Sequence, residues 1–273
     1  MKLKMRFESK DMIIFGIFAV ILFILVAIGV SNLVYLGKEG AFYGFNPSLA
    51  LFGGYFVETF VFFLIALIAL VVSGGHTELV YMKEEYSFEK LGGTLDDAVG
   101  ECYDKVAKVI GISYPGGPVV DKLAHTGKDT YDLPYPLDDK TYNFSFSGIK
   151  SAVINLVHNE SQRGNIINKE DLCTTFQNRV VSVLTRKTIR ALKEYNVNNL
   201  IVAGGVSANK GLRESLTEAC EKENIKVSFP RLSYCTDNAA MIGAAAYFAY
   251  KKGVRGDLTL TAMATDTIYK EWK

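Results

Sequence analysis

The sequence has 273 residues, a length that suffices for one large domain or two small ones. Apolar residues make up 49% of it, and its net charge is +1. So small a net charge excludes a general electrostatic attraction of the whole chain to nucleic acid. It does not exclude a local basic patch. The four cysteines contain no C-x-x-C pair, which argues against a zinc site and fits a reducing compartment.

The first quarter of the chain is strongly apolar. Residues 12–37 carry no charge, and this run exceeds the roughly 20 residues that a helix needs to cross a bilayer. Because the run is too long for a signal peptide and no small-residue cleavage site is evident, we expect a retained transmembrane helix. A second apolar stretch, residues 41–72, is interpreted as another transmembrane helix or, in its last part, as a buried strand. Both interpretations hold if the helix ends near Ala66 and the strand follows it.

The flanking charges predict the orientation of this segment. By the positive-inside rule, the basic residues before the first run place the N-terminus in the cytoplasm, namely Lys2, Lys4, Arg6 and Lys10. Two crossings return the chain to the cytoplasm, whereas one would export it, and the low-disulfide character of the rest favours two. We therefore expect a membrane-like segment over residues 1–68. A cytoplasmic domain over residues 69–273 would follow, anchored to the membrane by residues 12–37 and 41–66.

From Ala69 onward the pattern is that of an α/β domain. Apolar runs bounded by turn residues predict strands at 69–73, 78–82, 88–91, 199–203 and 225–229. Amphipathic or small-residue patterns predict helices at 95–110, 147–159, 169–195, 207–221 and 237–250, with a loop at 113–118. The alternation of strand and helix in the later part predicts a sheet that helices cover.

The segment Ser73-Gly-Gly-His-Thr77 follows the first of these strands. Two glycines allow a ligand to approach the backbone, and successive N–H groups in such a turn can bind phosphate oxygens. An ordinary hairpin turn explains the same residues equally well.

The segment Gly204-Gly-Val-Ser-Ala-Asn209 lies between a predicted strand and a predicted helix. Helix N-terminal N–H groups attract anions at this place, and Asn209 can offer both a donor and an acceptor to a ribose or a base. The alternative is a plain strand–helix turn with Ser207 as the N-cap.

The segment Thr236-Asp-Asn-Ala-Ala-Met-Ile-Gly243 opens the last predicted helix, whose small residues would let it pack closely on a neighbour. Either Thr236 or Asp237 could cap this helix. Alternatively, the Asp237 carboxylate could face the strand ends and hold a metal ion or a magnesium–phosphate group.

Acidic residues and a glycine turn form a fourth feature. Asp97 and Asp104 are seven residues apart and would share a helix face. The Gly116-Gly117 turn could admit a flat purine beside the backbone. No nucleophile–base triad is visible, and His76 alone is weak as a catalytic base, so the catalytic residues stay unknown.

Six segments occur in a specific order: S-G-G-H-T-E-L, D-D-A-V-G-E-C-Y-D-K, Y-P-G-G-P, F-S-F-S-G-I-K, A-G-G-V-S-A-N and C-T-D-N-A-A-M-I-G. In this order, from Ala69 onward, the chain closely resembles the TsaD family of tRNA N6-adenosine threonylcarbamoyltransferases. The resemblance implies an actin-like ATPase (ASKHA) fold, represented mainly by its second lobe. It also implies an acyltransferase activity. The threonylcarbamoyl group would pass from threonylcarbamoyl-adenylate to N6 of the adenosine beside the anticodon of tRNA.

The resemblance also implies site residues and partners. The adenylate, or ATP, would be lined by Val71, Val72, Ser73, Gly74 and Gly75 and contacted through its adenosine part by Asp104, Gly117, Asp121 and Asn209. Asp237 would be one ligand of a divalent metal ion, which is iron in the family. Partners would be tRNA and pathway proteins of the TsaB and TsaE type.

The chain departs from the family at its start. The family's first lobe opens with I-E-T-S-C-D-E and supplies an H-x-x-x-H metal pair, and this sequence contains neither. The alternative is therefore a catalytically impaired, membrane-tethered nucleotide-binding fragment or a gene-fusion product. A sugar kinase of the same fold class is a third hypothesis, which rests on fold analogy alone.

Overall fold

The structure is a computed structural model, and it describes residues 66–84, 87–257, 259 and 261. The expected transmembrane helices at 12–37 and 41–66 lie outside these residues, apart from Ala66 itself. Within the described ranges, no helix is both long enough and apolar enough to span a membrane.

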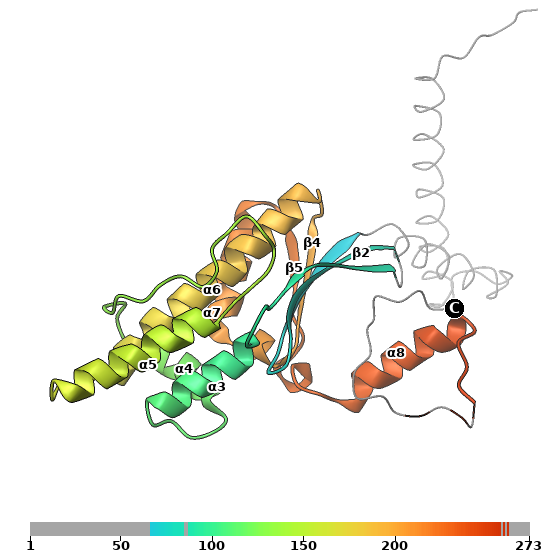
Figure 1. Cartoon of the computed structure of the whole chain (residues 1–273). Coiled ribbons are helices and arrows are strands. Elements are labelled where there is room, and N and C mark those ends of the chain that lie inside the picture. Colours follow the sequence, from blue (N-terminus) through green and yellow to red (C-terminus); the bar gives the residue numbers. More distant parts are fainter. Residues whose placement is uncertain (1–65, 85–86, 258, 260, 262–273) are drawn as a thin grey trace, which may run out of the picture. The chain divides into compact units, whose positions relative to one another are not determined.

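A five-stranded sheet forms the centre of the described domain, in the order β3-β2-β1-β4-β5 (Figure 1). The strands are β1 (Leu67–Val72), β2 (Thr77–Glu84), β3 (Ser87–Gly93), β4 (Asn199–Ala203) and β5 (Lys226–Ser228). The first three pair antiparallel, whereas β1 with β4 and β4 with β5 pair parallel. Parallel pairing of β1 with β4 therefore joins the two halves of the sequence.

Helices α3 to α7 gather on one side of this sheet (Figure 1). Their bounds are Val99–Val109 for α3, Gly116–Ala124 for α4, Ser147–Gln162 for α5, Lys169–Glu194 for α6 and Lys210–Lys222 for α7. Alternate residues of β1 and β4 are fully buried in the core that these helices share, namely Ile68, Leu70, Val72, Leu200 and Val202. Helix α8 (Ala239–Lys251) has no buried residue, so the close packing expected of its small residues is not observed.

The expected mixed α/β sheet is confirmed, and all five predicted strands form. The segment from Ala69 belongs to β1, so it joins the sheet. The expected loop at 113–118 is wrong in its second half, because α4 begins at Gly116. Pro118 lies in the first turn of α4, where a helix does not need its N–H, so the Pro-Gly-Gly-Pro pattern does not break the chain.

Helix starts differ from their predicted positions because of capping side chains. Helix α3 begins at Val99 and not at Leu95, because Thr77 Oγ1 accepts the Val99 N–H at 2.8 Å. As a result, Asp97 precedes the helix and does not share its face with Asp104. The segment from Gly205 to Ala208 is a short 3-10 helix, and Asn209 caps α7 in place of Ser207.

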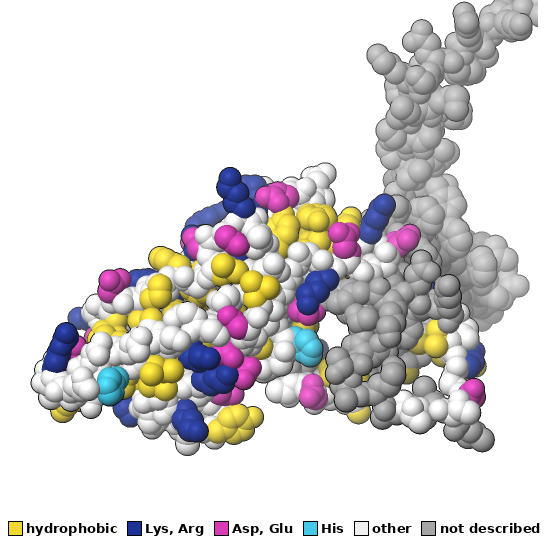
Figure 2. Space-filling model, viewed as in Figure 1, with side chains coloured by type: hydrophobic (Ala, Val, Ile, Leu, Met, Phe, Trp, Pro, Cys, Tyr) yellow, Lys and Arg dark blue, Asp and Glu magenta, His cyan; other side chains and the backbone are white. Residues whose placement is uncertain are grey.

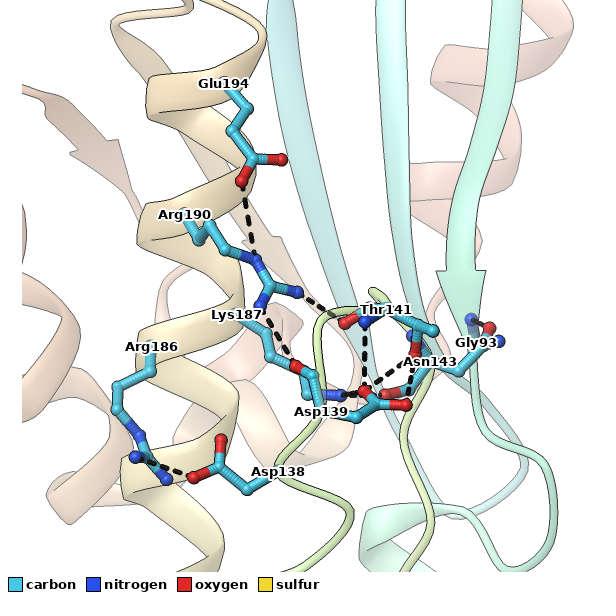
Figure 3. Close-up of polar contacts among 9 residues, drawn as sticks. All are labelled: Gly93, Asp138, Asp139, Thr141, Asn143, Arg186, Lys187, Arg190 and Glu194. Atoms are coloured by element: carbon cyan, nitrogen blue, oxygen red, sulfur yellow. Dashed lines mark hydrogen bonds and ion pairs between the residues drawn. The ribbon is translucent and has the colours of Figure 1, made fainter.

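Basic side chains of α6 hold the long loop between α4 and α5 against this helix (Figure 3). Lys187 is only 2% exposed, and its Nζ donates to Asp139 Oδ1 at 2.8 Å and to the Asn143 carbonyl. Arg190 donates to the Asp139 carbonyl at 3.0 Å. The neighbouring Arg186 makes an ion pair with Asp138 at 3.0 Å, with about half of each side chain exposed.

We expect Lys187→Met to lower the free energy of unfolding by about 1–3 kcal/mol, because it leaves the half-buried Asn143 carbonyl without the donor that Lys187 supplies. Arg186→Met is the matched control one residue away, and its exposed ion pair should matter by less than about 1 kcal/mol. Urea unfolding of the full chain checks both. Equal losses in the two variants would contradict the role given to Lys187.

The turn after β4 lies against the end of β1. Gly204 has a φ of +95°, and a Cβ at this position would lie 2.3 Å from the Val72 carbonyl oxygen. Only glycine combines this backbone conformation with so close an approach. Gly205, by contrast, has no atom within 4 Å of its would-be Cβ.

Gly204→Ala should therefore cost about 1–3 kcal/mol of stability from backbone strain, and more from the clash. Gly205→Ala is the control and should change stability by less than about 1 kcal/mol. Thermal or urea unfolding measures the difference. A Gly204→Ala variant as stable as Gly205→Ala would refute this account of the turn.

Candidate functional site

The two glycine turns lie side by side at the carboxyl end of the parallel strand pair β1 and β4. The contact between Gly204 and the Val72 carbonyl joins them directly, and the would-be Cβ of Gly204 also lies 3.3 Å from Ser73 Cβ. Ligands of open α/β sheets bind at this edge, because loops and helix N-termini meet there. The turns expected to face a ligand are therefore brought together.

The Ser73–His76 segment is the hairpin turn between β1 and β2, which was one of its two interpretations. The Ser73 N–H donates to the His76 carbonyl at 2.8 Å, and Ser73 Oγ accepts the N–H groups of Gly75 and His76 at 3.2 and 2.9 Å. Both glycines are exposed, with no atom within 4 Å of a would-be Cβ. Phosphate binding there stays a prediction.

The valines before this turn differ in what they can offer a ligand. The Val72 side chain is fully buried in the core, so only its backbone can face a ligand, whereas Val71 is half-buried on the opposite face of β1. Gly100, at the start of α3, donates its N–H to the Ser73 carbonyl at 3.1 Å. The turn therefore contacts the helix that carries Asp104.

Asp104 connects α3 to α4. Its Oδ1 accepts the N–H groups of Gly116 and Gly117 at 2.8 and 3.2 Å, which satisfies the first turn of α4. A Cβ on Gly116 would lie 2.2 Å from Ala107 Cβ, so this glycine serves the packing of α4 on α3. Gly117 is more open, with its nearest neighbour, Tyr103 Cβ, at 4.0 Å.

Asp121 and Asn209 meet through Gln177 of α6. Asp121 Oδ2 accepts the Lys210 N–H at 2.9 Å, and its Oδ1 accepts from Gln177 Nε2 at 2.9 Å and from the Gly211 N–H at 3.3 Å. Gln177 Oε1 in turn accepts from Asn209 Nδ2 at 2.9 Å. One polar network thus joins the second half of α4 to the N-terminus of α7 and includes two of the predicted adenosine residues.

Gln177 is a site residue that sequence reasoning missed, although the sequence carries a signal for it. Residues 172–177 of α6 are all buried. Gln177 lies on the same side of the helix as the buried apolar residues Cys173, Val180 and Val181. A lone amide on the buried face of a helix needs partners, so it marks a place where polar groups converge.

Asp237 stands apart from this network in sequence and in contacts. Its side chain is exposed in the loop before α8, and Asn238 caps that helix through a bond from the Met241 N–H at 3.0 Å. The caps expected from Thr236 or Asp237 are therefore wrong. The residues that the structure describes contain no group of three His, Cys, Asp or Glu able to hold a metal ion.

The network can bind and orient a polar ligand, but it contains no activated nucleophile. Burial raises the pKa of the Cys102 thiol to about 12, so this cysteine stays protonated at neutral pH. Burial likewise raises the pKa of Tyr103 well above its usual value, which keeps its hydroxyl a hydrogen-bond donor. A groove of about 390 Å³ between α4, α6 and α7 reaches Gln177, and its size falls in the range of ligand sites.

The surface offers little basic charge for nucleic acid on the face that Figure 2 shows. Lys and Arg side chains are interspersed there with Asp and Glu. The local basic patch left open by the sequence is therefore not seen on this face.

The paired aspartates after β3 fasten α5 to the site. Asp96 Oδ1 accepts the N–H groups of Phe146 and Ser147 at 2.8 and 3.3 Å, and its Oδ2 accepts from the Ser145 hydroxyl. Burial alone would raise the pKa of Asp96, but these hydrogen bonds outweigh it and lower the pKa. The D-D and F-S-F-S-G-I-K segments are therefore structural partners.

A carboxylate with a lowered pKa stabilises the folded state above its unfolded pKa of about 3.9, and this contribution is lost as pH falls through the folded pKa. We expect Asp96→Asn to be less stable than the wild type at pH 7, with a difference that shrinks below about pH 4. Urea unfolding across pH 3–7 measures this. Parallel curves for the two proteins would show that Asp96 contributes no linkage.

Comparison with known proteins gives this site its family context. The model described as "TsaD: tRNA N6-adenosine threonylcarbamoyltransferase" matches residues 63–244. The chain is 63% identical over 195 residues to the tRNA N6-adenosine threonylcarbamoyltransferase of Staphylococcus saprophyticus, covering 71% of this chain and 57% of that protein. It is 58% identical, with the same coverage, to that of a Staphylococcus aureus strain. The chain thus spans somewhat more than half the length of these relatives.

Solved structures show a shared fold at low identity. The chain resembles T.kodakarensis HypF with a TM-score of 0.51 and 14% identity, covering 69% of this chain and 34% of that one. A full-length HypF in its phosphate- and nucleotide-bound form gives the same TM-score over 68% and 33%. With the family match over most of the described domain, the chain belongs to the tRNA N6-adenosine threonylcarbamoyltransferase (TsaD) family.

Proposed function

We propose that the described domain binds the adenosine part of an adenylate or ATP where α4 meets the N-terminus of α7. The supporting observation is that Asp121 of α4 and Asn209 share one polar network through Gln177, while Asp104 accepts the first N–H groups of α4. All three residues have that role in the family resemblance. Asp104 and Asp121 supply carboxylate acceptors suited to ribose hydroxyls, and Asn209 supplies an amide. The exposed backbone of Gly74 and Gly75 would then face the phosphate or acyl end.

The domain would be the second lobe of an actin-like ATPase fold. The order β3-β2-β1-β4-β5, with three antiparallel strands followed by parallel additions, supports this assignment, as does the likeness to HypF. The activity proposed for the whole protein is transfer of a threonylcarbamoyl group from threonylcarbamoyl-adenylate to N6 of the tRNA adenosine beside the anticodon. Partners would be tRNA and proteins of the TsaB and TsaE type. The membrane-like segment expected over residues 1–68 would end before β1, which begins at Leu67.

The metal ion of the family does not fit the residues described. Asp237 provides one carboxylate in an exposed loop, and the sequence has no H-x-x-x-H pair to complete a site. A transition-metal ion requires several ligands in a defined geometry, which one carboxylate cannot supply. No step of the proposed activity is therefore assigned to a metal held by this chain.

Nucleotide binding tests the proposal directly. Asn209→Ser keeps an N-cap for α7, because serine caps as well as asparagine, but it removes the amide donor. We expect it to weaken ATP binding to the full chain about tenfold, the usual effect of one lost hydrogen bond, while stability changes by about 1 kcal/mol or less. Calorimetric titration measures the binding.

Asn168→Ser is the matched control, because Asn168 caps α6 in the same way by accepting the Asp171 N–H at 2.9 Å, away from the site. Its ATP affinity should equal that of the wild type. A full chain that binds no ATP would overturn the nucleotide site. ATP binding without complementation of a strain that lacks the tRNA modification would point to the impaired fragment.

A further inference from the structure

The side-chain amide of Gln177 has a fixed direction in the site. It is 4% exposed, and its Nε2 lies 2.9 Å from Asp121 Oδ1. A carboxylate can only accept hydrogen bonds, so the amide must turn its NH₂ group toward Asp121 and its oxygen the other way. The charge of Asp121 therefore determines the orientation of the Gln177 amide.

The oxygen of Gln177 in turn determines how Asn209 lies. Oε1 accepts from Asn209 Nδ2 at 2.9 Å and from the Tyr103 hydroxyl at 3.3 Å. Because an oxygen faces it, Asn209 must present its NH₂ group to Gln177, and its own Oδ1 then accepts the Leu212 N–H at 2.8 Å. Both ends of the Asn209 amide are thereby assigned.

Space around Gln177 is tight enough to keep this arrangement. A Cβ on Gly211 would lie 2.6 Å from Gln177 Nε2 and 3.5 Å from Asn209 Oδ1. Gly211 therefore leaves the space that the Gln177 amide occupies. A larger residue at this position would push the amide away from Asp121.

We propose that Gln177 is a positioning residue of the nucleotide site, which passes the polarity of the Asp121 carboxylate to the amide of Asn209. This inference rests on the proposed function, because it gives the orientation in which Asn209 meets the nucleotide. One Nδ2 hydrogen is bonded to Gln177, and the amide also hydrogen-bonds the Tyr103 hydroxyl. Because Oδ1 accepts the Leu212 N–H, we assign the NH₂ group, as a donor, to an acceptor atom of a ribose or purine.

Two substitutions separate positioning from packing. Gln177→Met preserves length and volume but removes both polar ends. Gln177→Glu places a second carboxyl beside Asp121, and two carboxyls sharing one site raise the pKa of one of them strongly. When protonated, the new carboxyl donates to Asp121 and accepts from Asn209, as the native amide does. The variant should therefore regain native behaviour at low pH.

The first measurement needs no nucleotide. In the ligand-free full chain, the ¹H–¹⁵N side-chain signals of Asn209 should shift in Gln177→Met and in Gln177→Glu at pH 8, and return toward their native positions in Gln177→Glu near pH 5. Asn178→Met, on the exposed side of the same helix, is the control and should leave these signals unchanged. Native Asn209 signals in Gln177→Met would overturn the proposal.

The second measurement is the ATP dissociation constant relative to the wild type at the same pH, so that titration of ATP itself cancels. We expect Gln177→Glu to bind about tenfold more weakly at pH 8, because its ionised carboxylate cannot donate to Asp121 and is repelled by it, which displaces the side chain that Asn209 contacts. Binding should be nearly normal at pH 5, where the protonated carboxyl donates to Asp121 again. An equal ratio at both pH values would overturn the proposal. A wild-type chain that binds no ATP would refute the proposed function alone, because the Asn209 signals still decide the role of Gln177.

Discussion

The constraint on which the domain depends is the buried polar side of α6. In a helix that crosses the core, each buried amide, hydroxyl or ammonium group without a partner costs about 1–3 kcal/mol. Most of these groups in α6 are paired, although the buried Thr188 hydroxyl has no partner among the described residues. Thr174 Oγ1 donates to the Ala124 carbonyl at the end of α4, and Thr175 Oγ1 accepts from the backbone of Thr130 and Tyr131. Gln177 joins the site network, and Lys187 holds the loop before α5. The hydrogen bonds of the buried polar side chains of α6 therefore position the loops around it.

The candidate site follows from this arrangement and from the sheet. Parallel pairing of β1 with β4 aligns the two glycine turns, while α6 brings α4 and α7 together at the same edge. Residues that look functional in sequence thus carry structural duties as well. Asp104 and Asp121 satisfy helix N-termini, and Thr77 caps α3. A ligand at this edge would meet groups whose positions are already determined by the backbone.

Sequence reasoning predicted the strands well, because short apolar runs that end in glycine have few alternatives. It predicted helix starts less well. The cap of α3 comes from Thr77, which is distant in sequence, and the cap of α7 comes from a residue expected to bind a ligand. Helix α4 was missed because proline and glycine in a first turn resemble a loop.

The site residues show the same limit. The six motifs in their order predicted Asp104, Gly117, Asp121 and Asn209. The structure pairs Asp104 with Gly117 and joins Asp121 to Asn209 through Gln177. Gln177 escaped because no spacing rule links a helix residue to a carboxylate on another helix. Only the tertiary fold supplies that contact. The separate position of Asp237 could not be read from the sequence either, because nothing in the pattern fixes where α8 lies.

The pairing of β1 with β4 also bears on the biosynthesis of the protein. Strand β1 ends at Val72, and its parallel partner begins only at Asn199. On the ribosome, the hairpins of β1, β2 and β3 are complete long before β4 emerges. The backbone groups on the edge of β1 that later pairs with β4 are therefore unpaired until then. An apolar strand in that condition is a template for wrong pairing between nascent chains. Yield in cells should therefore depend on chaperones that shield this edge until translation passes β4.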